Sequence, residues 1–371
     1  MEYFSILWEF VLPFLVVLTV LVFVHELGHY WIARRCDVRV EVFSVGFGPE
    51  LIGWTDQANT RWKISAIPLG GYVKMFGERE VSGEDEVPRP LTAAEKQVSF
   101  RYKSLGRRAA IVFAGPAANF IFAVIVLAGL YVSQGQPFTP AGIATVVEGS
   151  AAEKAGLKPG DVIVQIAGED IESFEQVQQK ISMIPERTVE LIVVRNDIEK
   201  VFTVTPGLRE FKDRFGNVVR IGLLGVTREG KTEVRQLGFL SAIWQAILET
   251  KVITLRTLEA VGQIIVGSRS SDELGGPIKI AQMSGEVWKM GFLSLVYFTA
   301  LISINLGLIN LFPIPMLDGG HLLFFAFEAI RGRPLGEKVQ ENGFRIGLVL
   351  VLSLMLFVIV NDFVNLPIWN T

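Results

Sequence analysis

Two histidines and a glutamate stand at a spacing that suits metal chemistry. His25, Glu26 and His29 form the pattern His-Glu-x-x-His. On a helix, this spacing places both imidazoles on one face, one turn apart, where a single zinc ion can bridge them. Glu26 would then lie beside the metal and could act as a general base. The pattern predicts a hydrolytic zinc site; the plainer alternative is a buried histidine pair satisfied by hydrogen bonds.

The same residues end an apolar run that is long enough to lie within a bilayer. Between residues 10 and 24, only Pro13 and Thr19 are not strongly hydrophobic. Ionisable groups at membrane depth are costly and are functional candidates by default. We therefore predict a metal site inside the membrane, in a hydrolase whose substrates also lie in the membrane.

A second polar cluster interrupts an apolar segment much later in the chain. Residues 310–321 read Asn-Leu-Phe-Pro-Ile-Pro-Met-Leu-Asp-Gly-Gly-His. The prolines and glycines break or kink a helix and free backbone groups that need polar partners. Catalytic zinc prefers three protein ligands and one open position. Asp318 and His321 are the nearby candidates for the third ligand.

Composition indicates a membrane protein with room for one soluble domain. The chain has 371 residues, is 50% hydrophobic and carries a net charge of −3, which points to no nucleic-acid partner. Cys36 is the only cysteine, so no internal disulfide can form. Four transmembrane helices are predicted, at about residues 10–33, 109–132, 291–318 and 346–360.

The distribution of basic residues predicts the orientation of these helices. No Lys or Arg precedes Arg34, thirteen lie from Arg34 to Arg108, and none follows Arg345. By the positive-inside rule, the basic loops face the cytoplasm, and both termini and residues 135–288 lie outside. The histidine pair then falls near the cytoplasmic end of the first helix.

The middle of the chain has the pattern of a soluble α+β domain. Runs of β-branched residues predict strands at residues 143–147, 188–194 and 200–204, and an amphipathic pattern predicts a helix at 173–184. The string Gly-Leu-Lys-Pro-Gly-Asp-Val-Ile, followed by Ile-Ala-Gly, resembles PDZ domains of bacterial proteases. That resemblance implies binding of a peptide C-terminus at a loop containing Gly142 and Ile143. A steric plug that grips no peptide is the alternative.

Two further segments have patterns that suit a membrane surface. Residues 40–76 alternate like hairpin strands with glycine-rich corners, which predicts a re-entrant β-sheet beside the active site. Its edge could pair with an unwound substrate; a cytoplasmic structural hairpin is about as well supported. Residues 229–290 are expected to form amphipathic helices on the membrane surface, one of them at 234–266.

Together these motifs resemble the site-2 protease family, peptidase family M50. The resemblance spans essentially the whole chain and is greatest to RseP-type bacterial regulators that cleave anti-sigma factors, although one PDZ signature stands here where the enterobacterial relative has two. It implies one Zn²⁺ per chain, held by His25, His29 and Asp318, with Glu26 activating water. It also implies that Asn310 holds the substrate backbone or stabilises the oxyanion.

The remaining polar residues of these helices receive structural roles in this scheme. His321 is expected to be a helix-packing residue or an outer partner of the metal site, and Asn305 to form an interhelical hydrogen bond or to play the same outer role.

The expected fold class is a polytopic α-helical membrane protein with about four transmembrane helices, a re-entrant β-sheet and one inserted extracytoplasmic PDZ domain. Its predicted parts are residues 1–134 with the first two helices, 135–228 as the PDZ domain, 229–290 as surface helices and 291–371 with the last two helices.

The expected function is regulated intramembrane proteolysis by a zinc metalloendopeptidase of the bacterial inner membrane. Its partners would be the lipid bilayer and single-pass transmembrane substrates, such as anti-sigma factors or signal-peptide remnants, after a first cut. A non-proteolytic PDZ scaffold and a zinc transporter or sensor are the alternatives. Glu26 disfavours the scaffold, and the second and fourth apolar segments offer almost no ligands for a transport path.

Overall fold

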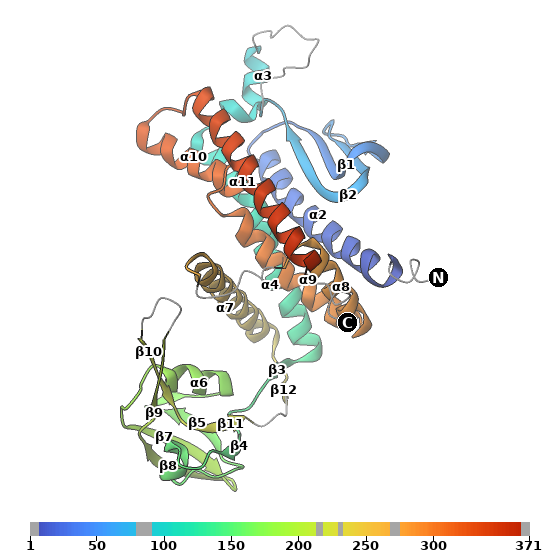
Figure 1. Cartoon of the computed structure of the whole chain (residues 1–371). Coiled ribbons are helices and arrows are strands. Elements are labelled where there is room, and N and C mark those ends of the chain that lie inside the picture. The colour runs from blue at the N-terminus through green and yellow to red at the C-terminus, as the bar shows by residue number, and fades with distance from the viewer. Residues whose placement is uncertain (1–6, 79–90, 213–217, 229–232, 268–274, 365–371) are drawn as a thin grey trace. The chain divides into compact units, whose positions relative to one another are not determined.

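The computed structural model describes residues 7–78, 91–212, 218–228, 233–267 and 275–364. They divide into two compact units (Figure 1). The helical unit comprises the described parts of residues 1–129, 242–262 and 270–371, and the inserted unit those of 130–241 and 263–269. Each unit is considered by itself.

Four helices of the described chain are long and apolar enough to cross a membrane, which confirms the predicted number. They are α2 (Leu12–Arg35, preceded by a π-helical turn at Leu7–Val11), α4 (Leu105–Gln134), α9 (Phe292–Asn310) and α11 (Glu337–Val364). The third apolar segment is helical only as far as Asn310, because the proline-rich stretch after it leaves the helix.

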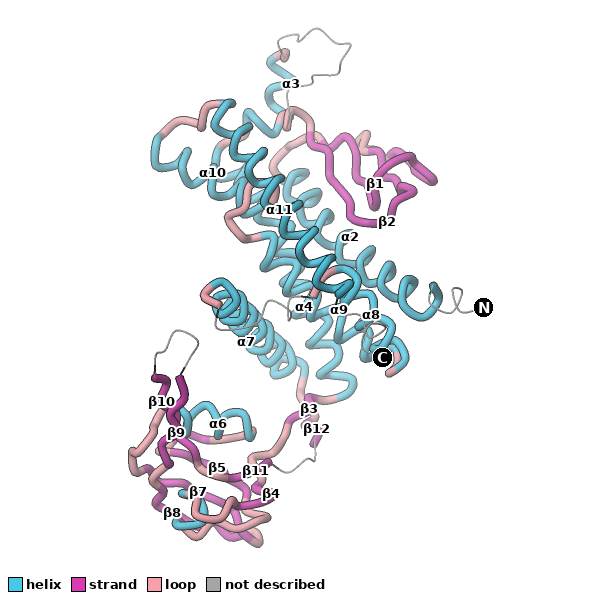
Figure 2. Tube along the Cα trace, in the orientation of Figure 1, coloured by secondary structure: helices cyan, strands magenta, loops and turns pink. Residues whose placement is uncertain are grey.

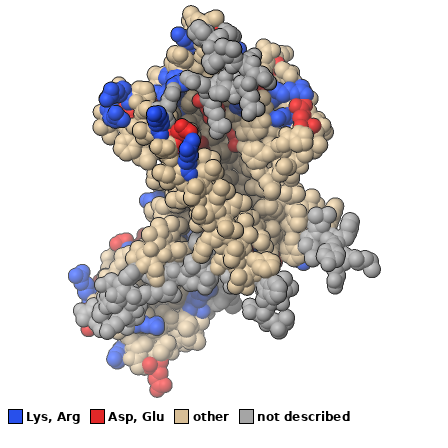
Figure 3. Space-filling view, turned by 45° about the horizontal axis from the view of Figure 1, so that its top comes forward, with Lys and Arg blue, Asp and Glu red and all other residues tan. Residues whose placement is uncertain are grey.

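Large apolar side chains cover the outside of these helices, as a lipid environment requires. Ile125 of α4 is 64% exposed and Leu356 of α11 is 65% exposed. Asn119 and Ser303, in contrast, are fully buried between helices. Figure 3 shows tan surface along these helices, with Lys and Arg gathered toward one end of the helical unit. This inverted polarity is typical of membrane proteins.

Small residues let the helices around α4 approach closely. A Cβ added to Gly28 of α2 would lie 2.3 Å from the carbonyl oxygen of Ala114, and one added to Gly307 of α9 would lie 3.0 Å from that of Pro116. Val17 and Leu21 of α2 pack with Leu295 of α9 in one buried cluster. Close backbone approach of this kind drives association where lipid removes the hydrophobic force between helices.

The predicted hairpin at residues 40–76 consists of β1 (Val40–Thr55) and β2 (Arg61–Met75), drawn as magenta tube in Figure 2. Both strands bend, so that β1 residues 40–45 pair with both ends of β2. The four half-strands therefore lie in the order 50–55, 61–65, 40–45 and 71–75. Within the described chain, no further strand pairs with residues 71–75, which leaves an open edge.

Among the described residues, five further helices belong to the helical unit. They are α3 (Ala93–Val98), the 3₁₀ turn at Phe100–Tyr102, α7 (Phe239–Ile265), α8 (Pro277–Lys289) and α10 (Asp318–Arg331). The helix predicted at 234–266 is α7, and it is not among the helices apolar enough to span a membrane.

The inserted unit is the expected α+β domain. A four-stranded antiparallel sheet in the order β6-β5-β7-β8 packs with two helices, and shorter strand pairs flank it. In chain order the elements are β3 (Gln136–Phe138), β4 (Ile143–Val146), α5 (Ala151–Lys154), β5 (Val162–Ile166), β6 (Glu169–Asp170), α6 (Phe174–Ser182), β7 (Val189–Arg195), β8 (Ile198–Val204), β9 (Gly207–Lys212), β10 (Val218–Leu223), β11 (Val226–Arg228) and β12 (Glu233–Arg235).

The Pro-Gly-Asp of the PDZ-like signature has a structural role in this unit. Asp161 is fully buried and accepts hydrogen bonds from Arg195 Nε (2.6 Å) and from the Lys158 backbone (2.8 Å). Burial alone would raise the pKa of the Asp161 carboxyl, but these partners hold it below its ordinary value.

The hairpin β9–β10 had no counterpart in the sequence prediction.

Candidate metal centre and active site

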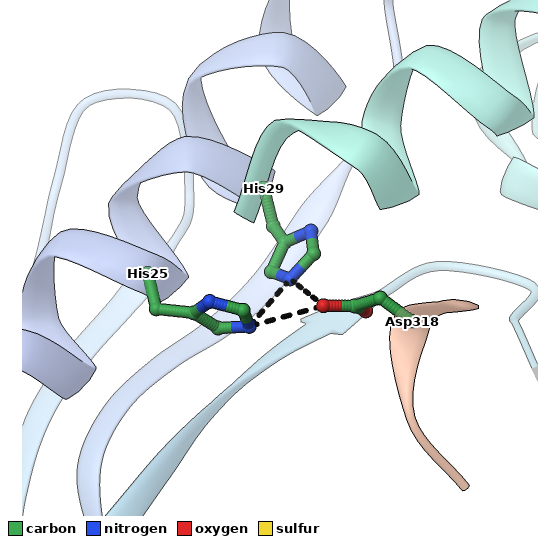
Figure 4. A group of neighbouring side chains, drawn as sticks. All are labelled: His25, His29 and Asp318. Atoms are coloured by element: carbon green, nitrogen blue, oxygen red, sulfur yellow. Dashed lines mark hydrogen bonds and ion pairs between the residues drawn. The ribbon is translucent and has the colours of Figure 1, made fainter. Parts of the chain in front are cut away.

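The three predicted metal ligands converge on one point (Figure 4). His25 Nε2 lies 3.2 Å from Asp318 Oδ2, and His29 Nε2 lies 3.5 Å from the same oxygen. The two Nε2 atoms are 3.2 Å apart. Among the described residues, this is the group of three His, Cys, Asp or Glu side chains that could hold a metal ion.

These separations fit zinc. Zinc binds nitrogen and oxygen ligands at about 2.0–2.2 Å in a tetrahedron, which sets neighbouring ligand atoms roughly 3.3–3.6 Å apart. The observed separations of 3.2, 3.2 and 3.5 Å lie at or within 0.1 Å of that range. Two imidazoles and one carboxylate leave the fourth position of the tetrahedron for water or substrate.

Helix α4 contacts both imidazoles at Nδ1, the ring nitrogen that faces away from Asp318. His29 Nδ1 lies 2.9 Å from the carbonyl oxygen of Ile111, and His25 Nδ1 lies 3.1 Å from the side-chain amide of Asn119. Hydrogen bonding at the far ring nitrogen is how proteins orient a metal-ligating histidine. Helix α4 therefore provides the outer partners of both histidines.

Gly115 allows α4 to come this close to the histidines. A Cβ at this position would lie 2.2 Å from His29 Nε2 and 2.9 Å from His25 Cε1. Both distances are shorter than any side chain tolerates, so residue 115 must be glycine for the imidazoles to keep their places. The sequence pattern alone did not single out this residue.

Asp318 is positioned by the first turn of α10 and by the loop before it. It is the first residue of the helix, where the helix dipole favours a carboxylate. The two glycines after it pack against the loop: a Cβ at Gly319 would lie 2.3 Å from the carbonyl oxygen of Leu311, and one at Gly320 would lie 2.4 Å from that of Ile314. Close packing therefore requires the two glycines that follow Asp318.

Glu26 lies beside the ligands and against the sheet. Gly71 brings the strand close, because a Cβ there would lie 2.7 Å from Val22 Cγ1 and 3.3 Å from Glu26 Cγ. The open edge at residues 71–75 thus runs along the helix that carries Glu26.

A network at the other end of the sheet fixes its position relative to α2. Asp56, in the β1–β2 turn, accepts hydrogen bonds from Tyr30 Oη (3.2 Å), Trp62 Nε1 (3.0 Å) and the backbone of Thr60 (2.9 Å). Burial would raise the pKa of the Asp56 carboxyl, but the hydrogen bonds lower it overall. Tyr30 directly follows His29, so the network links the sheet to α2, the helix that carries both histidines.

The ligands open into a large cavity of the helical unit, with a volume of about 1130 Å³. Glu26, Asn310 and His321 line it, as does the edge of β2 at residues 71–73. Its lining also includes charged side chains, among them Arg108, Glu328 and Arg345. The cavity therefore joins the metal ligands to a polar region.

Of the other predicted site residues, two line the cavity and one joins two helices. Asn310 is the last residue of α9 and lines the cavity, as its predicted role requires. His321 also lines the cavity and packs on Phe344 of α11, with ring centroids 5.1 Å apart. Asn305 accepts a hydrogen bond from Thr257 of α7 (3.0 Å), so it joins two helices.

The predicted peptide-binding loop in the inserted unit has little free backbone. The Ile143 N–H donates to Asp161 O (2.8 Å), and its carbonyl accepts from Gly160 N (2.8 Å). Gly142 forms a β-bridge with Val162. A role for Gly142 and Ile143 in peptide binding stays a prediction that these contacts do not support.

Sequence reasoning missed Ile111, Gly115 and Asn119. A signal was available for Asn119, because it is the one carboxamide in an uncharged apolar segment, and such residues are functional candidates. No sequence pattern marks Ile111, since its contribution is a backbone carbonyl.

Comparison with known proteins now identifies the family. The model of peptidase family M50 matches residues 13–354. The chain belongs to peptidase family M50. It is 41% identical over 362 residues to a protein of Agrobacterium fabrum named "Putative zinc metalloprotease Atu1380", covering 96% of each chain. It is 36% identical over 373 residues to Metalloprotease MmpA of Caulobacter vibrioides, covering 94% of each.

Membership of family M50 makes this chain a zinc metalloprotease by family and confirms the predicted resemblance and fold class. Part of the chain matches the PDZ domain of an SdrC-like protein from Listeria monocytogenes at 18% identity and a TM-score of 0.20, covering 24% of this chain and 88% of that one. A likeness at that TM-score carries no weight for function.

Proposed function

We propose that this M50 protein is an intramembrane protease that binds one zinc ion per chain at His25, His29 and Asp318. One observation carries the proposal: three donor atoms at zinc-like separations open into the same cavity as Glu26 and the open edge of β2. A hydrolase needs these parts together, namely a metal, a base and a place for an extended peptide.

The residues around the three ligands have separate roles in the proposed reaction. Zinc, when bound, supplies Lewis acidity toward water and the scissile carbonyl. Glu26 accepts the proton of the attacking water and can return it to the leaving amine. The close approach of strand β2 at Gly71 keeps the Glu26 side chain beside the sheet. Asn310 would donate a hydrogen bond to the substrate carbonyl, or to the oxyanion formed from it.

The open edge of β2 supports an extended substrate. A transmembrane helix hides its carbonyls in its own hydrogen bonds, so it must unwind before hydrolysis. Pairing with residues 71–75 would replace the lost bonds by strand addition. The substrates would be single-pass transmembrane proteins, such as anti-sigma factors trimmed by a first protease, or signal-peptide remnants.

The four apolar helices and membership of family M50 support a location in a bacterial inner membrane. The positive-inside rule places both termini and the inserted unit outside, and the metal site near the cytoplasmic side. The charged lining of the cavity, including Arg108 and Glu328, would let water reach the site from that side. A peptide C-terminus at the inserted unit is a further proposed partner.

Replacing Glu26 by glutamine tests the proposed chemistry. Glu26→Gln should retain zinc and abolish cleavage of a tagged single-pass substrate in membranes, because the amide cannot take a proton. Glu9→Gln is the matched control, since Glu9 lies on the same N-terminal segment and pairs with Lys289 at the surface. Cleavage by Glu26→Gln at the wild-type rate would contradict the assignment.

The same assay separates protease from scaffold or transporter. A scaffold would cleave nothing, with or without Glu26. A zinc transporter needs successive ligand groups, whereas the described residues hold the group at His25, His29 and Asp318. Comparing substrates with and without their outer domain would show whether the inserted unit filters by size.

A further inference from the structure

Asn119 lies behind the metal site, where α2, α4 and α9 meet. Its side chain is fully buried, and its amide nitrogen is placed 3.1 Å from His25 Nδ1. Its backbone carbonyl accepts a hydrogen bond from Ser303 Oγ of α9 (2.9 Å). The residue therefore touches a metal ligand on one side and a neighbouring helix on the other.

An Asn119 amide with its nitrogen toward His25 Nδ1 conflicts with zinc binding. If Asn119 Nδ2 donates a hydrogen bond to His25 Nδ1, then His25 Nδ1 must be the unprotonated ring nitrogen. The proton of the neutral ring is then on His25 Nε2. A protonated Nε2 cannot ligate a metal, yet Nε2 is the atom that faces Asp318 and His29. Asn119 Oδ1 is buried without a hydrogen-bond partner, so it does not hold the amide in this orientation.

Turning the amide by 180° removes the conflict. The oxygen and nitrogen of a carboxamide are nearly equal in shape, and their assignment follows from the hydrogen bonds around them. With Oδ1 toward the ring, Asn119 accepts a hydrogen bond from His25 Nδ1–H, and the proton stays on Nδ1. The ring then presents its Nε2 lone pair to the metal.

Helices α2 and α4 contact each other through residues that have the same four-residue spacing on both helices. Ile111, Gly115 and Asn119 are each four residues apart and so lie on one face of α4. His25 and His29 have the same spacing on α2. Ile111 contacts one imidazole, Asn119 contacts the other, and Gly115 leaves room for both.

We infer that Asn119 is a positioning residue that fixes the metal-binding tautomer of His25 through its carboxamide oxygen. The inference rests on the zinc-binding part of the proposed function and not on proteolysis. Asn119 acts with the Ile111 carbonyl, so that both histidines reach the metal with their Nε2 lone pairs already aligned.

Two substitutions of similar size distinguish positioning from packing. Asn119→Leu keeps the shape and removes the acceptor, whereas Asn119→Asp keeps the acceptor and adds a charge. Positioning predicts that Asn119→Leu lowers zinc affinity about 10- to 100-fold and that Asn119→Asp matches or exceeds the wild type. Packing predicts the reverse order, because a buried apolar residue suits a helix junction and an unpaired charge does not.

Zinc affinity would be measured on the purified full-length protein by chelator competition, and Co²⁺ absorption would report the coordination geometry. Ser303→Ala is the control, since it removes the helix contact of Asn119 and should leave zinc affinity unchanged. Wild-type affinity in Asn119→Leu, or equal loss in both variants, would overturn the inference. If Asn119→Leu does not fold, weaker binding by Asn119→Asp than by the wild type would overturn it as well. Absence of zinc binding by the wild type would instead refute the proposed function.

Discussion

The two histidines and the aspartate reach the proposed metal centre by different structural routes. His25 and His29 lie one turn apart on a single helix, and each has a contact from α4 at its far nitrogen. Asp318 comes from a helix start that follows an irregular loop, and glycines pack that start against the loop. We call these the histidine half and the aspartate half of the site.

The two halves differ in what fixes the positions of their ligand side chains. In the histidine half, helix geometry sets the ligand spacing and a second helix sets the ring orientation. In the aspartate half, no local repeat sets the position, so it depends on how the loop at residues 311–317 packs. Met316 in that loop has a φ of 100°, a conformation that most side chains avoid. The aspartate half should therefore be sensitive to changes in its neighbours.

Removing the single ligand of the aspartate half should have the largest effect. Asp318→Asn should lower zinc affinity by more than the roughly 100-fold typical of losing an outer partner, because a charged ligand is lost. Cleavage of a single-pass substrate should fall to background. Asp37→Asn, a change at an exposed turn near the end of α2, is the control. Zinc binding within a few-fold of the wild type would show that Asp318 is no ligand.

A methyl group between the imidazoles should damage the histidine half next most. Gly115→Ala places a Cβ where His29 Nε2 lies 2.2 Å away, so the rings must move. Zinc affinity should fall about 10- to 100-fold. Gly129→Ala is the matched control on the same helix, since nothing lies within 4 Å of its added Cβ. Chelator competition on both variants measures the effect, and equal affinities would mean that α4 does not support the histidines.

A change that moves only the loop should affect the aspartate half alone. A Cβ at Gly347 of α11 would lie 1.8 Å from the carbonyl oxygen of Pro315, so Gly347→Ala should displace the loop. Cleavage should fall about 10- to 100-fold, as expected for a misplacement of roughly 1 Å. Zinc affinity should fall less than in Gly115→Ala.

Val349→Ala, at a 65% exposed position of the same helix, is the comparison for this change and should cleave normally. If Gly347→Ala keeps full activity, the aspartate half tolerates movement of its loop, and the contrast between the halves is wrong.

The smallest effect is expected outside both halves, at Asn305. Its hydrogen bond from Thr257 joins α7 to α9. Asn305→Leu should leave zinc affinity unchanged and reduce stability by about 0.6 kcal/mol, an average value for such bonds in membranes. Thermal unfolding of Asn305→Leu, Thr257→Val and the double variant measures it; the double variant should lose no more than either single one. A drop in zinc affinity would extend the site to Asn305.

Much of the fold and the site could be predicted from the chain itself. The four apolar helices, the α+β insert and the β-hairpin all follow from local patterns of apolar and turn residues. The histidine pair follows from helical spacing, and Asp318 from the family motif. The β9–β10 hairpin was not predicted, because strand pairing depends on neighbours distant in sequence. The third helix was predicted to run to about residue 318, but it ends at Asn310 because prolines follow it.

Sequence by itself determined which chemical groups this protein offers: the His-Glu-x-x-His pattern, the Asp-Gly-Gly motif and the apolar segments around them. These are properties of residue type and local period, which a linear pattern records. Only the tertiary structure decided how the parts act together, in that α4 supports both imidazoles through Ile111 and Asn119, and the open edge of β2 runs beside Glu26. Such contacts join backbone atoms and side chains from separate helices and strands, so no local pattern in the sequence specifies them.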